Sequence, residues 1–409
     1  MFQSSRRKFL STTAAASAVM TFGNRAPAFL RQAAGATKYD GRILVVVEMA
    51  GGNDGLNTVI PFDNDDYRKA RPKLAVPKSD VLKINDELGL NSVMTGFSKL
   101  LEAGQLAIVQ GVGYENPNRS HFESMDIWHT CQRKDQQRVD GWLGRYFQQT
   151  IDANKTDPAG LHLGEDKQPF ALMSRDVRVP SIRSLEEFRL NGNEDPAFRK
   201  AVRELSDARR DAGNDLLGFV QSSTSSAITA SERIESAGMQ YKPSTEYPDS
   251  GLGQKLQTVA KLVNSGLTTP VYYVRIDGFD THSQQAGAHQ ALLRQVSDAV
   301  TNFLNDMVAH GHGDQILCMC FSEFGRRVNE NASEGTDHGT AGPIFLAGTQ
   351  VHAGLVGKHP SLSDLKDGDL QHHTDFRQVY GTVLEKWLRC DSKSILGGDY
   401  AIVDAIKAS

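Results

Sequence analysis

The sequence predicts an α/β fold in which a doubly wound, mostly parallel sheet carries helices on both faces. Short apolar runs recur along the chain, and glycine or polar residues stop each of them. Stretches with helical periodicity separate these runs. Strands that alternate with helices form a parallel sheet that is covered on both sides, and such strands are apolar throughout.

Five apolar runs are the predicted strands, and five periodic stretches are the predicted helices. The strands are 43–49 (ILVVVEM), 106–112 (LAIVQGV), 271–276 (VYYVRI), 316–321 (ILCMCF) and 343–347 (PIFLA). The helices are 92–103, 120–131, 255–267, 286–310 and 375–388, the last with Thr374 as its N-cap.

The first 36 residues are typical of a twin-arginine export signal. Arg6 and Arg7 precede a mildly apolar stretch, and small residues that suit a cleavage site follow it. A frayed amphipathic helix with a chance arginine pair is the alternative. Export implies contact with the twin-arginine machinery and a periplasmic or extracellular location. Residues 37–409 are predicted to form one domain, with a polar, partly helical insertion at about 150–250.

Composition excludes several classes of protein. The 409 residues carry a net charge of −4 and no basic block, which argues against a nucleic-acid partner. No run of about 18 apolar residues occurs, so no stable membrane span is expected. Four cysteines in a chain of this length do not make a disulfide scaffold. Cys318 and Cys320 alternate on a predicted strand and are interpreted as small buried apolar residues.

Polar residues follow the predicted strands, and the carboxyl ends of parallel strands meet at one edge of the sheet, where ligands bind. Carboxylates and imidazoles that gather there beside Arg and Ser indicate a metal site that handles an anion. The residues concerned are Asp54, Asn57, Arg119, Ser120, Asp277, Asp280, His282, Glu323 and Arg326, with Asp337 and His338 before the fifth strand.

Two of these residues also have simpler explanations. Asp54 lies in a glycine-rich turn, where a carboxylate commonly accepts hydrogen bonds from backbone amides. Ser120 and Glu123 have the spacing of a capping box. The capping role and a functional role of Ser120 are compatible, because a helix N-terminus also favours an anion.

Together these segments resemble the family catalogued as domain of unknown function 1501. The resemblance rests on the export signal and on residues 47–57 (VEMAGGNDGLN), 118–123 (NRSHFE), 278–282 (GFDTH), 321–326 (FSEFGR), 336–339 (TDHG) and 374–380 (TDFRQVY). The family is placed among alkaline-phosphatase and sulfatase-like proteins. The resemblance therefore implies an alkaline-phosphatase-like fold and a metal-dependent ester hydrolase.

The same resemblance implies roles for individual residues. Asp54 matches the metal ligand that follows the first strand, and Ser120 matches the nucleophile at a helix start. Asp277 or Asp280, with His282, matches the third element. Asp337 and His338 match the Asp-His pair that holds a metal. His372 or His373 is the candidate for a late histidine ligand, and the Cys-x-Pro-Ser-Arg segment of sulfatases that use formylglycine is absent.

These observations combine into one hypothesis, a hydrolase of phosphate or sulfate esters that uses a metal-activated Ser120 or water. The predicted metal ligands are Asp54, Asp280, His282, Asp337 and His338. The ion would be zinc, manganese, magnesium or calcium. Glu323 is predicted either to position a ligand or to act as general acid or base. Arg119, Arg326 and Asn57 are predicted to bind the small-molecule or polymer-borne anionic ester.

Two other hypotheses belong to different classes. The chain could be a non-catalytic secreted module for binding or assembly, with a vestigial or structural metal site. A hydrolase with a Ser-His-Asp triad is the third reading, but no Gly-x-Ser-x-Gly elbow surrounds Ser120.

Overall fold

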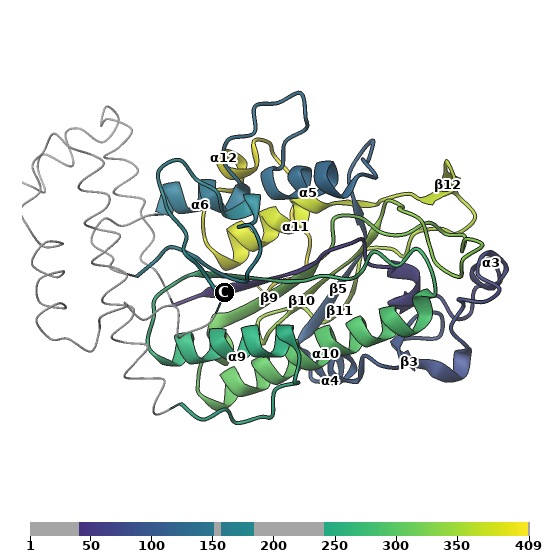
Figure 1. Cartoon of the computed structure of the whole chain (residues 1–409), viewed down its shortest axis with the longest axis horizontal. Coiled ribbons are helices and arrows are strands. Elements are labelled where there is room, and N and C mark those ends of the chain that lie inside the picture. The colour runs from purple at the N-terminus through teal and green to yellow at the C-terminus, as the bar shows by residue number, and fades with distance from the viewer. Residues whose placement is uncertain (1–40, 151–156, 184–240, 408–409) are drawn as a thin grey trace, which may run out of the picture. The chain divides into compact units, whose positions relative to one another are not determined.

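A computed structural model describes residues 41–150, 157–183 and 241–407 of the chain. A nine-stranded sheet runs through this part of the protein (Figure 1). From one edge to the other its strands are β11 (Gly354–Val356), β5 (Leu106–Gly113), β10 (Gly342–Ala347), β9 (Ile316–Phe321), β1 (Ile43–Met49), β8 (Val271–Ile276), β6 (Leu161–Leu163) and β7 (Ser181–Ile182), and β14 (Thr374–Asp375) also pairs with β5.

The sheet is mostly parallel, as the sequence predicts. β1 pairs in parallel with β9 and β8, and β6 pairs in parallel with β8 and β7. β10 is the exception in this sheet, because it runs antiparallel to both of its neighbours, β5 and β9. The residues just before β10 therefore lie at the edge of the sheet where β5 and β9 end.

Helices cover both faces of the sheet, and Figure 1 shows them as two groups on opposite sides. One group contains α4 (Thr95–Glu102), α9 (Gly251–Asn264) and α10 (Gln285–Ala309). The other contains α5 (His121–Thr130), α6 (Trp142–Thr150), α11 (Phe376–Thr382) and α12 (Ser392–Leu396). A separate hydrophobic core lies under each group.

β1 shows why the predicted strands are apolar throughout. Val45 and Val47 belong to the core under α9 and α10, whereas Leu44 and Val46 belong to the core under α5 and α11. All four side chains are fully buried. A strand covered on both faces has no solvent side, so it lacks the alternation of apolar and polar residues that a half-exposed strand shows. The predicted doubly wound α/β fold is confirmed.

Shorter elements pack around a third core that contains Leu56, Ile60, Tyr67 and Val328. Their bounds are η1 (Gly55–Asn57), β2 (Val59–Ile60), α3 (Asp65–Ala70), η2 (Lys78–Asp80), β3 (Val81–Lys83), β4 (Gly89–Asn91), β12 (Leu365–Lys366) and β13 (Asp369–Leu370). The remaining short helices are η3 (Phe170–Leu172), η4 (Gly313–Gln315) and the π-helix η5 (Val383–Trp387).

The start of the closing helix differs from the prediction. Thr374 is not the N-cap, because it belongs to β14 and pairs with β5. Asp375 caps α11 instead, and its side chain forms a complete capping box with Gln378. The pairing of β14 with β5 thus shifts the cap by one residue from the predicted position.

The predicted insertion is only partly described. Its residues 157–183 supply β6 and β7, which extend the main sheet beyond β8. Residues 184–240 and the predicted export signal lie outside the described residues. Among the helices of the described ranges, none is both long and apolar enough to span a membrane. The four cysteines are free, and Cys318 and Cys320 are buried in β9 as expected.

Candidate metal centre and active site

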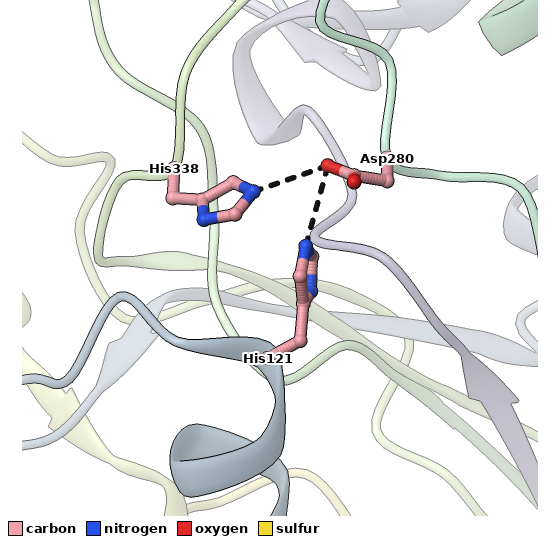
Figure 2. Close-up of side chains that lie close together, drawn as sticks. All are labelled: His121, Asp280 and His338. Atoms are coloured by element: carbon pink, nitrogen blue, oxygen red, sulfur yellow. Dashed lines mark hydrogen bonds and ion pairs between the residues drawn. The ribbon is translucent and has the colours of Figure 1, made fainter.

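Three histidines surround one carboxylate oxygen at the carboxyl edge of the sheet. Oδ1 of Asp280, in the loop after β8, lies 3.0 Å from Nε2 of His282, 3.1 Å from Nε2 of His338 and 3.3 Å from Nε2 of His121. Figure 2 shows His121 and His338 pointing toward Asp280 from different segments of the chain. The ligand atoms of His121, Asp280 and His338 all lie within 4.8 Å of one another, so these residues could hold a metal ion.

Each of the three imidazoles is held from behind by an oxygen atom at its other nitrogen. These contacts are His121 Nδ1 to Glu323 Oε1 (2.8 Å), His282 Nδ1 to Asp337 Oδ1 (3.2 Å) and His338 Nδ1 to the carbonyl of Arg119 (2.7 Å). A carbonyl or an ionised carboxylate only accepts hydrogen bonds, so each Nδ1 carries the proton. The lone pair of a neutral ring is then on Nε2 and faces Asp280. Histidines that bind metals in proteins show this arrangement.

Two of the three imidazoles are close enough to repel each other. Nε2 of His282 and Nε2 of His338 are 2.9 Å apart. If both rings are neutral with the proton on Nδ1, two lone pairs face each other across this distance. A proton on one ring or a shared cation removes the repulsion, and the nearby carboxylate of Asp280 attracts either of them.

The turn after β1 supports the centre through hydrogen bonds to Glu323. Glu323, which follows β9, accepts hydrogen bonds from the backbone N–H groups of Gly51 (2.9 Å) and Gly52 (3.2 Å) as well as bonding His121. Gly51 has φ +118°, and a Cβ on it would lie 2.4 Å from the backbone nitrogen of Asp280. Glycine is therefore required there for both conformation and space.

Arg326 fixes Asp280 and is too deeply buried to contact a substrate. Its guanidinium donates to Oδ1 of Asp280 at 2.7 Å. It also donates to the carbonyl oxygens of Gly51, Gly52, Phe279 and Thr336. The side chain has no exposed surface. The predicted role of Arg326 as a substrate ligand is therefore corrected to that of a positioning residue.

The charges at the centre follow from these contacts. Burial raises the pKa of Asp280, but the guanidinium group of Arg326 and the neighbouring imidazoles outweigh burial and lower it to about 2. The hydrogen bond to Glu323 raises the pKa of His121, whereas burial lowers the pKa of His338. At neutral pH the centre therefore presents an ionised carboxylate beside a neutral His338.

Asp54 and Asn57 lie in a different environment, next to Arg71. Nη1 of Arg71 is 2.6 Å from Oδ2 of Asp54 and 2.8 Å from Oδ1 of Asn57. Asn57 also accepts a hydrogen bond from Tyr67 and donates to the carbonyl of Leu74, and its side chain is buried. The predicted substrate contact of Asn57 is corrected for that reason. Asp54 does not belong to the group around Asp280.

Ser120 borders the centre through its two neighbours in sequence. His121 belongs to the centre, and the carbonyl of Arg119 holds His338. Ser120 precedes α5 and is exposed, but its side chain makes no capping hydrogen bond. The predicted capping box is wrong, because Glu123 forms an ion pair with Arg138 instead.

Two arginines flank a buried carboxylate beside this centre. Arg119 forms an ion pair with Oδ2 of Asp369, and Nε of Arg327 lies 3.9 Å from Oδ1 of the same residue. Burial raises the pKa of Asp369. Both arginine side chains keep about a third or more of their surface exposed, at 39% and 34%. The backbone N–H of Arg327 also bonds the carbonyl of Asp337, which ties this pair to the centre.

The other predicted residues have definite places. Asp337 contacts Nδ1 of His282 and does not belong to the group formed by His121, Asp280 and His338. Asn331 also donates a hydrogen bond to Asp337, at 3.2 Å. Asp277 forms an ion pair with Arg275 at 2.6 Å, and burial raises its pKa. Neither His372 nor His373 belongs to the group around Asp280 among the described residues.

His121 is the residue of this centre that the sequence analysis did not assign. Its signal was present, because it stands directly after Ser120 in the segment NRSHFE that follows a predicted strand. The spacing of Ser120 and Glu123 in this segment also fits a capping box, in which the residues between them need no function.

Several solved structures match this chain at low sequence identity and low TM-score. The PsFucS1 sulfatase from Pseudoalteromonas sp. is 9% identical with a TM-score of 0.37, and the match covers 87% of this chain and 68% of that one. The C-terminal periplasmic domain of EcEptC from Escherichia coli, in complex with Zn, is 9% identical with a TM-score of 0.36, covering 76% and 75%. The alkaline phosphatase from the Antarctic bacterium TAB5 is 8% identical with a TM-score of 0.25, covering 74% and 91%.

A comparison with curated proteins finds no match. A family model described as "Protein of unknown function (DUF1501)" matches residues 42–395. This match extends over all nine strands of the main sheet and over every residue of the candidate centre. The chain therefore belongs to the DUF1501 family.

Proposed function

We propose that the protein is an exported, zinc-dependent hydrolase of phosphate or sulfate esters. The observation that carries this proposal is the convergence of three imidazole Nε2 atoms on Oδ1 of Asp280 while an oxygen atom holds each Nδ1. Such a set of side chains costs free energy when the centre holds neither a cation nor an extra proton, because lone pairs face each other across 2.9 Å.

The donor set decides between the candidate metals. Three imidazole nitrogens and one carboxylate oxygen suit zinc best, and they suit manganese less well. Magnesium and calcium prefer oxygen ligands, which the group around Asp280 supplies through one residue alone. We therefore assign His121, His338 and Asp280, whose ligand atoms lie within 4.8 Å of one another, as metal ligands. His282, with its Nε2 2.9 Å from that of His338, is the proposed fourth ligand, and Glu323 and Asp337 are the carboxylates that orient His121 and His282.

When bound, zinc would act as a Lewis acid that polarises the ester and lowers the pKa of a nearby hydroxyl or water. Ser120 is the proposed nucleophile, because its hydroxyl is exposed, makes no capping bond and lies between two residues that contact the centre. Glu323 is fully occupied by His121 and the backbone of Gly51 and Gly52, so we assign it to orientation rather than to proton transfer.

Arg119 and Arg327 are the proposed ligands of the phosphate or sulfate group. Asp369 holds Arg119 and lies close to Arg327, and both arginine side chains keep exposed surface. A fixed pair of guanidinium groups recognises the oxygens of such an anion in a defined orientation. Arg327 thus takes the place that the sequence analysis gave to Arg326.

One feature favours a second candidate function, a secreted binding module with a structural zinc site. Four protein ligands complete the tetrahedral shell that structural zinc sites have, whereas catalytic sites keep a position open. The exposure of the ligands argues for catalysis instead, since the Asp280 side chain is 47% exposed and solvent reaches the centre.

The test is metal analysis of the purified protein together with turnover of aryl phosphates and aryl sulfates. We expect bound zinc, release of the aryl group, and loss of both in His338→Ala. Ser120→Ala should keep the zinc and lose turnover. His352→Ala is the matched control, because His352 is also an exposed histidine paired with an aspartate, Asp404.

A protein that binds zinc and hydrolyses neither ester, at any metal loading, would support the structural alternative. A protein without zinc affinity would remove both. Export is tested separately, by following the full-length chain into the periplasm or medium and by replacing Arg6 and Arg7 with lysine, which should leave the protein inside the cell.

A further inference from the structure

A cluster of side-chain and carbonyl oxygens, separate from the histidine centre, surrounds Asp54. The guanidinium group of Arg71 lies within this cluster. Oδ2 of Asp54 lies 2.6 Å from Nη1 of Arg71, and neither side chain has any exposed surface. Nε and Nη2 of Arg71 donate to the carbonyl oxygens of Val328 and Arg327, at 2.9 and 2.8 Å. Arg71 thus supplies the positive charge that an ionised carboxylate needs in the protein interior.

The other side-chain oxygens near this ion pair already accept hydrogen bonds. The contacts are Tyr67 and Arg71 to Asn57 Oδ1, Thr58 and His289 to Asn53 Oδ1, and Thr336 to Gln285 Oε1. Gln285 in turn donates to Oδ2 of Asp54. Oδ1 of Asp54 has no hydrogen-bond partner among the described residues. One such oxygen is far short of the roughly four to eight ligands that zinc, magnesium or calcium takes.

Arg326 plays a comparable part between this cluster and the histidine centre. It donates to Asp280 on one side and to the carbonyl oxygens of Gly51 and Gly52 on the other. Two fully buried guanidinium groups therefore occupy the space along the turn that links β1 to the centre. Their positive charges would repel a further cation there at close range, because no water screens the interaction.

From this arrangement we infer that the protein binds a single divalent cation, at the histidine centre, and that Arg71 takes the place of a second cation beside Asp54. The inference rests on the proposed function and extends it by fixing the number of metal ions. Two-metal hydrolases hold their ions about 3.5–4 Å apart and stabilise the attacking and the leaving oxygen with one ion each. A single-metal centre leaves part of this stabilisation to fixed positive side chains.

Metal stoichiometry tests the inference. The purified protein is saturated with zinc, freed of loosely bound ions by gel filtration and analysed for zinc per chain. We expect one zinc in the wild type, one in Asp54→Asn and none in His338→Ala. Two zinc ions in the wild type that fall to one in Asp54→Asn would overturn the inference and leave the proposed function standing. Absence of zinc from the wild type would overturn both.

A double-mutant cycle in the metal-free protein tests the role of Arg71 independently. Arg71→Met leaves the Asp54 carboxylate buried without a cation, so we expect a clear drop in the thermal unfolding midpoint. Adding Asp54→Asn removes that charge and should recover part of the loss. Arg71→Lys, which keeps the charge, should lose less than Arg71→Met. If the second substitution brings no recovery, Arg71 does not serve as the counter-charge and the inference fails.

Discussion

The carboxylates behind the histidines should control zinc affinity in the order of their burial. Glu323 is 2% exposed and is held by two backbone N–H groups, so it orients His121 rigidly. Asp337 is 58% exposed, and water screens its contact with His282. Loss of such an orienting partner weakens metal binding by about 10- to 100-fold. We expect about 100-fold for Glu323→Gln and about 10-fold for Asp337→Asn, or about 2.7 and 1.4 kcal/mol.

The affinities are measured by competition with a chromophoric zinc chelator at constant pH and ionic strength. Glutamine offers one acceptor oxygen in place of two, so Glu323→Gln also leaves a backbone N–H of the β1 turn unpaired, at a cost of about 1–3 kcal/mol of folding free energy. Urea unfolding of the metal-free variants separates that loss from the loss of affinity. Asp404→Asn is the matched control, because Asp404 contacts an exposed histidine, His352, outside the centre.

Two results would refute this reasoning. A loss far above 100-fold in Asp337→Asn would make Asp337 a direct ligand, as the sequence analysis predicts. A loss below about threefold in Glu323→Gln would show that the contact with His121 does not orient a metal ligand.

Three further predictions concern stability. Ser120→Ala should leave the unfolding free energy within about 0.5 kcal/mol of wild type by calorimetry, since its hydroxyl caps nothing, whereas Asp375→Ala should cost about 1 kcal/mol; equal losses would contradict this. Burial lowers the pKa of His289 to about 4, so the unfolded chain binds more protons between pH 6.5 and 4 and stability falls as the pH drops through that range. Urea titrations should show that the unfolding free energy of the wild type falls by about 2 kcal/mol from pH 7 to 5. The fall should be smaller in His289→Gln and unchanged in His352→Gln. Parallel pH profiles for all three proteins would contradict the role of His289. Chelation should remove about 2.7 kcal/mol of stability from protein held at a hundredfold excess of zinc over its Kd, but not from His338→Ala, and an unaltered midpoint in the wild type would argue against a bound ion.

Local pattern was sufficient to predict five of the nine strands of the sheet, whereas the short strands β6, β7, β11 and β14 were not predicted. β1, β8 and β9 begin and end at the predicted residues, because a run of apolar side chains buried on both faces ends where the sheet meets the solvent. Direction was not predictable for β10. The residues 343–347 have the same apolar pattern whether the strand runs parallel or antiparallel, and only the folded chain shows the reversal.

The residue types of the site and its place at the sheet edge were predictable from the sequence, whereas the exact set of residues that meet there was less so. Asp280, His282 and His338 do meet at the expected edge of the sheet. Asp54 and Arg326 are residue types that bind metals or anions at a surface, yet the same types form ion pairs in the interior. The ion pair with Arg71 makes Asp54 an interior residue and not a surface ligand. Arg71 lies 17 positions away in a polar stretch, and no local motif identifies it as the partner of Asp54. Long-range pairing of that kind is a property of the fold and not of any local motif.

The reversal of β10 explains how imidazoles from such distant segments reach one carboxylate. His121 follows β5 and Asp280 follows β8, and these strands lie on opposite sides of β10, β9 and β1 in the sheet. A parallel β10 would begin at the opposite edge and carry His338 away from both. The loops after β9 and β1, which lie between, supply Glu323 and the Gly51 amide as a brace. Substitutions in these two loops should therefore change the properties of the centre without touching a ligand, and the effect of Glu323→Gln measures how strongly they do so.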